Sequence, residues 1–166
     1  MRTYSAYRII LTAGLICGLL DAISAIVAAR FFGGVPLRVF QGIASGLIGR
    51  TAFQGGISSA LLGLGLHFVI ATGAATVYYF ASRSLPILLD EALVCGGIYG
   101  VLVHLFMTFV VIPLSAIGRR PFVPRTFMVY MAVAMIVIGP SISLTVRHFS
   151  RLSFSRKGID AAQKIS

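Results

Sequence analysis

The sequence predicts an all-α membrane protein with four transmembrane helices and a short interfacial or re-entrant helix between helices 1 and 2. Composition is the first reason. Of the 166 residues, 58% are hydrophobic and only 11% are charged, whereas a soluble domain averages about 25% charged residues. So few charged side chains cannot cover a water-facing surface. The second reason is four long apolar runs, because about 20 apolar residues in a helix cross a bilayer core about 30 Å thick.

Each of the four apolar runs contains at most one Asp, Glu, His, Lys or Arg. The runs are residues 9–29, 57–81, 92–117 and 127–146. Glycine, proline and arginine clusters lie between them and predict turns. We therefore predict one transmembrane domain over residues 1–150 and a basic C-terminal tail over residues 151–166.

The segment between the first two runs, residues 36–48, is apolar but too short to cross a bilayer. Pro36 has the fixed φ that suits a first helical turn. We expect the segment to be either a lid over one end of the bundle or a re-entrant element that lines a pathway. Polar side chains in or near it are available to tie it to a helix end, because an amide or guanidinium carries several donors. These are Arg38, Gln41 and Gln54.

The distribution of Lys and Arg predicts the orientation in the membrane. With four spans, both termini lie on one side, which carries eight of the basic residues against six on the other. The first set is Arg2, Arg8, Arg83, Arg147, Arg151, Arg156, Lys157 and Lys164; the second is Arg30, Arg38, Arg50, Arg119, Arg120 and Arg125. Basic residues gather on the cytoplasmic side. We therefore expect both termini to lie in the cytoplasm.

The formal net charge of +10 does not indicate nucleic-acid binding here. Its basic residues lie at the ends of apolar runs, as topology signals do, and they are not interleaved with exposed aromatic residues. The expected partners are the lipid bilayer and either other membrane subunits or further copies of the chain, with no nucleic acid.

Three polar residues, Asp21, His67 and His104, each lie near the middle of a predicted span. A charge at that depth costs about 2.5–3.5 kcal/mol on insertion scales, so these side chains are expected to turn inward. Each lies on a helical stripe of small residues, and such stripes let membrane helices pack closely. We therefore predict one midplane polar cluster in which Asp21 is hydrogen-bonded to one or both histidines. The packing glycines are Gly14, Gly18, Gly63, Gly97 and Gly100.

The pattern leaves three roles open for this cluster. It can be a structural hydrogen-bonded group that fixes helix register, a proton or ion relay, or a metal or haem site with Asp21, His67 and His104 as candidate ligands. The spacing matches no recognised cofactor motif, so no cofactor is predicted, and haem or a divalent metal is the weaker option. There is no nucleophile elbow, phosphate loop or paired carboxylate in the sequence, so no catalytic residue is predicted and the chain is not expected to be an enzyme.

Several stretches of the chain resemble a group of small bacterial inner-membrane proteins. They are GVPLRVFQGIASGLIG at 34–49, Gly55-Gly56, LGLGLHF at 62–68, Tyr78-Tyr79 and FVVIPLS at 109–115. The resemblance covers about residues 10–145. The resemblance implies four helices. The group is uncharacterised and has no assigned activity, so it gives no functional residue to carry over.

Three functions remain compatible with the sequence. The first is a structural or accessory subunit of a membrane complex, which suits the small-residue helix faces and short loops. The second is a small transporter or channel with an Asp/His relay at the bilayer midplane. The third is a haem- or metal-binding membrane protein.

Overall fold

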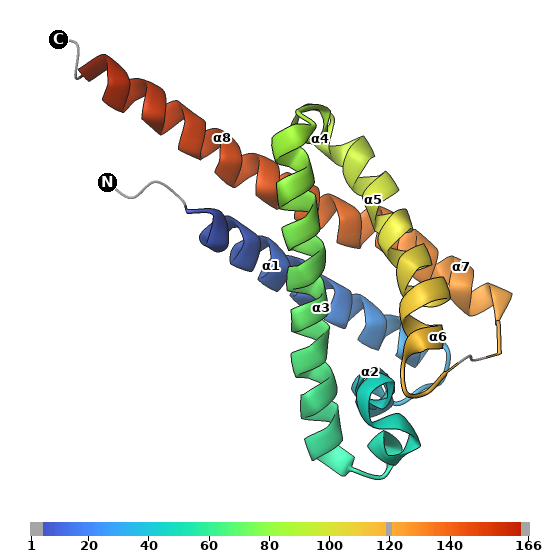
Figure 1. Ribbon diagram of the computed structural model, residues 1–166. Helices are drawn as coiled ribbons and strands as arrows, with labels where there is room; N and C mark the ends of the chain where they lie inside the picture. The colour runs from blue at the N-terminus through green and yellow to red at the C-terminus, as the bar shows by residue number, and fades with distance from the viewer. Residues whose placement is uncertain (1–4, 119–120, 164–166) are drawn as a thin grey trace.

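The computed structural model describes the backbone of residues 5–118 and 121–163, and the side chains of these ranges as far as Leu152. The regular secondary structure in these ranges is helical, with turns and loops between the helices (Figure 1). In chain order the elements are α1 (Ala6–Phe31), α2 (Pro36–Ile48), a 3-10 turn η1 (Gly49–Phe53), α3 (Gly56–Ser84), α4 (Ile87–Asp90), α5 (Ala92–Phe106), a π-helical segment η2 (Met107–Val111), α6 (Ile112–Leu114), α7 (Pro124–Val133), a second π-helical segment η3 (Ala134–Ile138) and α8 (Gly139–Gln163).

Four helical stretches are long and apolar enough to cross a membrane, which confirms the number of predicted spans. They are Ala6–Phe31, Gly56–Ser84, Ala92–Leu114 and Pro124–Leu152. The third combines α5, η2 and α6 and ends at Leu114, earlier than predicted. The fourth combines α7, η3 and the first part of α8.

The predicted basic tail, residues 151–166, is only partly described. Its backbone continues α8 as far as Gln163, and its side chains beyond Leu152 lie outside the described part of the chain. Of the other basic residues counted for orientation, Arg2, Arg119 and Arg120 lie outside it as well.

Both π-helical segments end two residues before a proline, a feature that the span prediction did not include. Segment η2 precedes Pro113, and η3 precedes Pro140. A proline ring inside an α-helix clashes with the carbonyl four residues earlier and removes one hydrogen bond. A wider π turn changes the position of that carbonyl, and such single-turn bulges are the usual form of π-helix. The fourth span therefore continues well past Pro140, whereas the third ends at Leu114, one residue after Pro113.

Helix α1 and the fourth span run side by side, and α3 crosses them (Figure 1). Helix α1 packs against both α3 and α8, and α5 packs against α8 and η3. The buried core lies where α1, α3 and α8 meet, and consists of Ile9, Ala13, Cys17, Ala75, Tyr78, Tyr79, Ile142 and Val146. The short helix α2 packs mainly on α3.

Glycines mark the closest helix contacts. Gly14 lies against Thr72 and Gly18 against Phe68, so both bring α1 close to α3. Gly63 faces the backbone of Phe40, so it makes room for α2 and not for another spanning helix.

On α5 the closest approach involves Gly96 and Gly100, one residue away from the predicted Gly97. Gly96 meets the backbone of Gly139, and Gly100 meets the backbone of Ala134, so a Cβ at either position would overlap its neighbour. Gly97 has only looser contacts with Met135. The third span is therefore attached to the fourth through two backbone contacts one helical turn apart.

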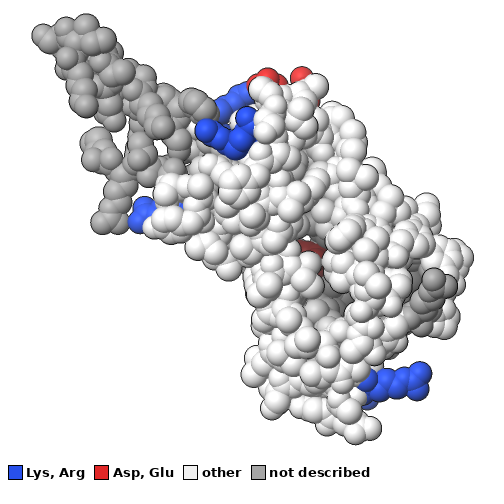
Figure 2. Space-filling model, in the orientation of Figure 1, with Lys and Arg blue, Asp and Glu red and all other residues white. Residues whose placement is uncertain are grey.

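The spans differ in how far the rest of the protein covers them. In the third span, 6% of the most apolar stretch is buried, against 28–33% in the other three. Figure 2 shows charged atoms near the ends of the visible face and an uncharged surface between them. This surface is interrupted by a hollow with recessed acidic atoms.

Candidate functional site

Asp21 and His67 lie next to each other where α1 crosses α3. His67 Nε2 donates a hydrogen bond of 2.8 Å to the Gly18 carbonyl. Its Nδ1 lies 4.0 Å from Asp21 Oδ2, which is too long for a direct hydrogen bond. Because Gly18 and Asp21 are three residues apart, both face His67 from one side of α1. The structure therefore brings together two members of the predicted cluster.

Aromatic rings enclose the imidazole of His67. Phe68 meets it edge-on with ring centroids 5.6 Å apart, and Phe40 of α2 does so at 6.5 Å. Gly18 allows the helices to approach, since a Cβ there would overlap the Phe68 ring. The His67 side chain is consequently almost fully buried, with 9% of its surface exposed, whereas Asp21 keeps 28%.

The hydrogen bond to Gly18 determines what the pair can do chemically. A carbonyl only accepts, so Nε2 carries a proton, and in the neutral ring Nδ1 is then an acceptor. One further proton can reside either on the Asp21 carboxyl or on His67 Nδ1. In either arrangement the pair as a whole is neutral, which avoids the cost of a net charge in a bilayer. The geometry therefore suits a two-residue unit that holds one proton.

The Asp21 end of the pair is the accessible end. Its partly exposed carboxyl contrasts with the buried ring of His67. In Figure 2 the recessed acidic atoms lie at the base of the hollow, whose walls are uncharged. Access to the pair is therefore from the side of the molecule, at the carboxyl and not at the imidazole.

His104 does not join this pair, so the predicted three-residue cluster is not formed. Its ring instead lies against Phe127, with centroids 5.0 Å apart. Its Nε2 is buried without a hydrogen-bond partner. In the described residues no hydrogen bond or ion pair links His104 to Asp21 or His67. The stripe of small residues on α5 faces α8 and η3, and this takes His104 away from α1.

The described part of the chain contains no group of three or more His, Cys, Asp and Glu residues that could hold a metal ion. Asp21 and His67 supply two adjacent side chains of ligand type, and His104 lies elsewhere. A three-ligand site from these residues is therefore not assembled in this structure. Haem or divalent-metal binding, the weaker option in the sequence analysis, stays untested.

The polar residues of the loop between α1 and α3 have different environments. Gln41 is buried, and its Nε2 donates to the Gly56 carbonyl at 3.0 Å and to Ser59 Oγ at 3.4 Å. Arg38 donates to the Phe53 carbonyl at 3.3 Å and lies over the Phe53 ring. Gln54, in contrast, is exposed. Helix α2 is therefore tied to the start of α3 by Gln41 and not by Gln54.

The contacts of Arg147 and Arg151 with Asp90 were not predicted from the sequence. Arg147 donates to the Asp90 carbonyl at 3.2 Å, and Arg151 donates to Asp90 Oδ1 at 3.4 Å. The two arginines are four residues apart, so they share one face of α8. That spacing was visible in the sequence, but their common partner on α4 depends on tertiary structure.

No protein-family model, curated protein or solved structure matches this chain. The functional argument therefore depends on the geometry of the chain itself.

Proposed function

We propose that the protein is a structural or accessory subunit of a membrane-embedded assembly, in which another membrane helix covers α5. The observation that carries this proposal is the low burial of the third span, 6% against 28–33% for the others. Helix α5 meets α8 mainly through glycines. Its other faces present large apolar side chains such as Ile98, Leu102 and Phe106.

Apolar exposure alone does not distinguish a protein partner from lipid, because acyl chains cover leucine as well as another helix does. The partly exposed carboxyl of Asp21 provides the further argument. Lipid offers no hydrogen bond to this carboxyl group, which is costly at mid-membrane even when the Asp21–His67 pair is neutral overall. A partner helix that supplies a donor to the hollow removes this cost, whereas lipid does not. The proposed partner therefore carries a polar group at the depth of Asp21.

We further propose that α2 is re-entrant and lies below the membrane surface. It packs on α3, and its Phe40 contacts His67. His67 lies eleven residues after Gly56, the first residue of α3, which is about 16 Å along a helix. If α3 crosses the bilayer, Phe40 therefore lies well inside the apolar layer. Membrane-depth backbone must be satisfied by protein or water, and the backbone carbonyl of Gly46 accepts from Ala116 N at 2.9 Å.

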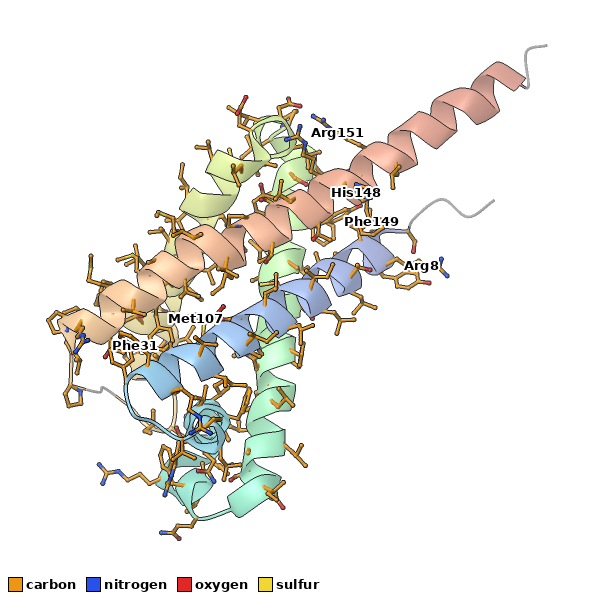
Figure 3. All side chains as sticks on the ribbon, turned by 180° about the vertical axis from the view of Figure 1, so that it is seen from behind. Arg8, Phe31, Met107, His148, Phe149 and Arg151 are labelled. Atoms are coloured by element: carbon orange, nitrogen blue, oxygen red, sulfur yellow. The ribbon has the colours of Figure 1, made fainter. Side chains whose placement is uncertain are left out.

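The proposed location is a bacterial inner membrane with both termini in the cytoplasm. The support is the excess of basic residues on the terminal side, eight against six. Figure 3 shows three described basic side chains, Arg8, His148 and Arg151, at the end of the molecule where α1 begins. Fusions of a cytoplasm-dependent and a periplasm-dependent reporter to the C-terminus test the orientation.

Extraction of the native complex in mild detergent tests the subunit role. The wild-type chain is expected to elute at a mass larger than that of one chain. Replacing Ile98, Leu102 and Phe106 by alanine is expected to release the single chain, because these positions form one exposed stripe of α5. The matched control replaces Leu15, Leu19 and Ile23 by alanine on the exposed stripe of α1. A single-chain mass for the wild type, or equal release by both variants, would contradict the proposal.

A second candidate, a proton or ion pathway, is favoured by one specific observation. The Asp21–His67 pair is arranged to hold one proton and is open on its Asp21 side. Proton flux into liposomes that contain the purified chain tests this role. Flux that is abolished by Asp21→Asn but kept by His104→Gln would support a pathway, since His104 lies apart from the pair. The absence of flux in the wild type would remove this candidate.

A further inference from the structure

We propose that the end of the molecule formed by α4 and α8 binds the headgroup of an anionic phospholipid. An open depression of about 620 Å³ lies there along one face of α8, lined by Leu144, Arg147, His148, Arg151 and Leu152. All five residues lie on one face of α8, since they follow the three- and four-residue spacing of a helix. The inference rests on the membrane location proposed above but not on the presence of a protein partner.

The position of Asp90 indicates the depth of this site in a membrane. It ends α4, the short turn between the second and third spans. A turn that joins two spans lies near the membrane surface, because each span takes up the thickness of the apolar layer. Arg147 and Arg151 both contact Asp90. Their guanidinium groups therefore lie at the depth of lipid headgroups, and Figure 2 shows basic and acidic atoms together at this end.

The positive charge at this site is only partly neutralised. Arg147 donates to the backbone carbonyl of Asp90, a neutral acceptor, so its charge has no counter-ion in that bond. Arg151 pairs with the Asp90 carboxylate at 3.4 Å, and both side chains are more than half exposed. Each guanidinium has five N–H donors, so most donors of both arginines are available to a further acceptor. Phosphate oxygens match the planar fork of arginine.

The leucines indicate a lipid rather than a soluble phosphate compound. Leu144 lies one helical turn from Arg147 and His148, toward the centre of the span, and Leu152 lies next to Arg151. Both leucine side chains are exposed. A site with basic groups at headgroup depth and apolar groups beside them fits a molecule that has a phosphate and an acyl chain. Basic residues next to the cytoplasmic end of a membrane helix attract anionic lipid headgroups.

The test is a lipid titration of the purified full-length chain in detergent, followed by native mass spectrometry. Phosphatidylglycerol, phosphatidylcholine and inorganic phosphate are added in separate series. Phosphatidylglycerol is expected to bind at least about 10-fold more tightly than phosphatidylcholine. The double variant Arg147→Gln/Arg151→Gln is expected to weaken phosphatidylglycerol binding by about 10- to 30-fold. The control Arg30→Gln/Arg50→Gln, which removes two charges at the opposite end of α1 and α3, is expected to change it by less than about 2-fold.

Two further variants keep the test decisive if the double glutamine variant does not fold. Arg147→Lys/Arg151→Lys retains the charges and is expected to retain most of the binding. Asp90→Asn removes the competing carboxylate and is expected to strengthen binding. Equal binding of the two lipids, equal loss in the control, or weaker binding by Asp90→Asn would overturn the proposal. Displacement of the lipid by an equal concentration of inorganic phosphate would assign the site to a soluble phosphate compound and would overturn it too.

Discussion

The regions around His67 and His104 are packed very differently, although each has an imidazole near the middle of an apolar helix. His67 lies in a closed crossing, where the Gly18 carbonyl, Phe40 and Phe68 surround its ring. His104 lies on the loosely covered third span, with Phe127 beside it and Nε2 unpartnered. One imidazole is therefore fixed by three helices of its own chain, and the other is only partly enclosed.

This difference shows that one chain can provide hydrogen-bond and packing partners for one mid-membrane histidine and not for another. In the first region the chain itself supplies the acceptor and the covering rings. In the second region the chain leaves an imidazole nitrogen and most of α5 without such partners. The enclosed nitrogen is out of reach of a partner, so it is the open surface of α5 that an additional subunit could cover.

The largest effect is expected where α2 meets α3 in the His67 region. A leucine at Gly63 would collide with the backbone of Phe40, so Gly63→Leu is expected to lower the free energy of unfolding by about 3 kcal/mol or more. Gly65, two residues later, has no atom near its missing Cβ, so Gly65→Leu is the matched control and should change it by less than about 1 kcal/mol. Reversible unfolding in bicelles measures both. Equal losses of unfolding free energy for the two variants would show that α2 does not pack against Gly63.

The two imidazoles are expected to contribute unequally to stability. His67→Ala removes a buried ring and its bond to Gly18, with an expected loss of about 2–3 kcal/mol in the free energy of unfolding. His104→Ala also removes an unpartnered buried nitrogen, so its cost should be about 1 kcal/mol or less. The same unfolding assay compares them. A larger loss of unfolding free energy for His104→Ala than for His67→Ala would contradict the conclusion that His67 is the better packed of the two.

A smaller effect is expected for the glutamines of the loop that supports the His67 region. Gln41→Ala breaks one part-buried and one buried hydrogen bond and is expected to cost about 1–2 kcal/mol in unfolding free energy. Gln54 is exposed, so Gln54→Ala should have an effect within about 0.5 kcal/mol. Similar losses in thermal unfolding experiments would contradict the assigned role of Gln41.

The smallest effect on the stability of the isolated chain is expected for Asp21→Asn. The Asp21–His67 distance of 4.0 Å is too long for a direct hydrogen bond, and asparagine has nearly the same shape as aspartate, so little packing is lost. The net change should therefore be below about 1 kcal/mol. A loss above about 2 kcal/mol in the same assay would mean that the carboxyl is bound more tightly than the geometry indicates.

Much of the fold was predictable from the sequence, because span length and hydrophobicity follow directly from bilayer thickness. The four helices were predicted in this way. The pairing of Asp21 with His67 was also predictable in part, since both lie at mid-span on small-residue faces. The separation of His104 was not, because a stripe of small residues shows that a helix packs closely but not against which neighbour. The actual contacts, Gly96 with Gly139 and Gly100 with Ala134, direct α5 toward the fourth span.

The most direct test of the central claim is photo-crosslinking in native membranes. A photoreactive amino acid replaces Leu102 on α5 or, as the control, Leu19 on α1; the two side chains are equally exposed at 56%. The account predicts a discrete protein adduct from position 102 and predominantly lipid adducts from position 19. Lipid adducts alone from both positions would contradict it, because α5 would then be covered by the bilayer and not by another protein helix.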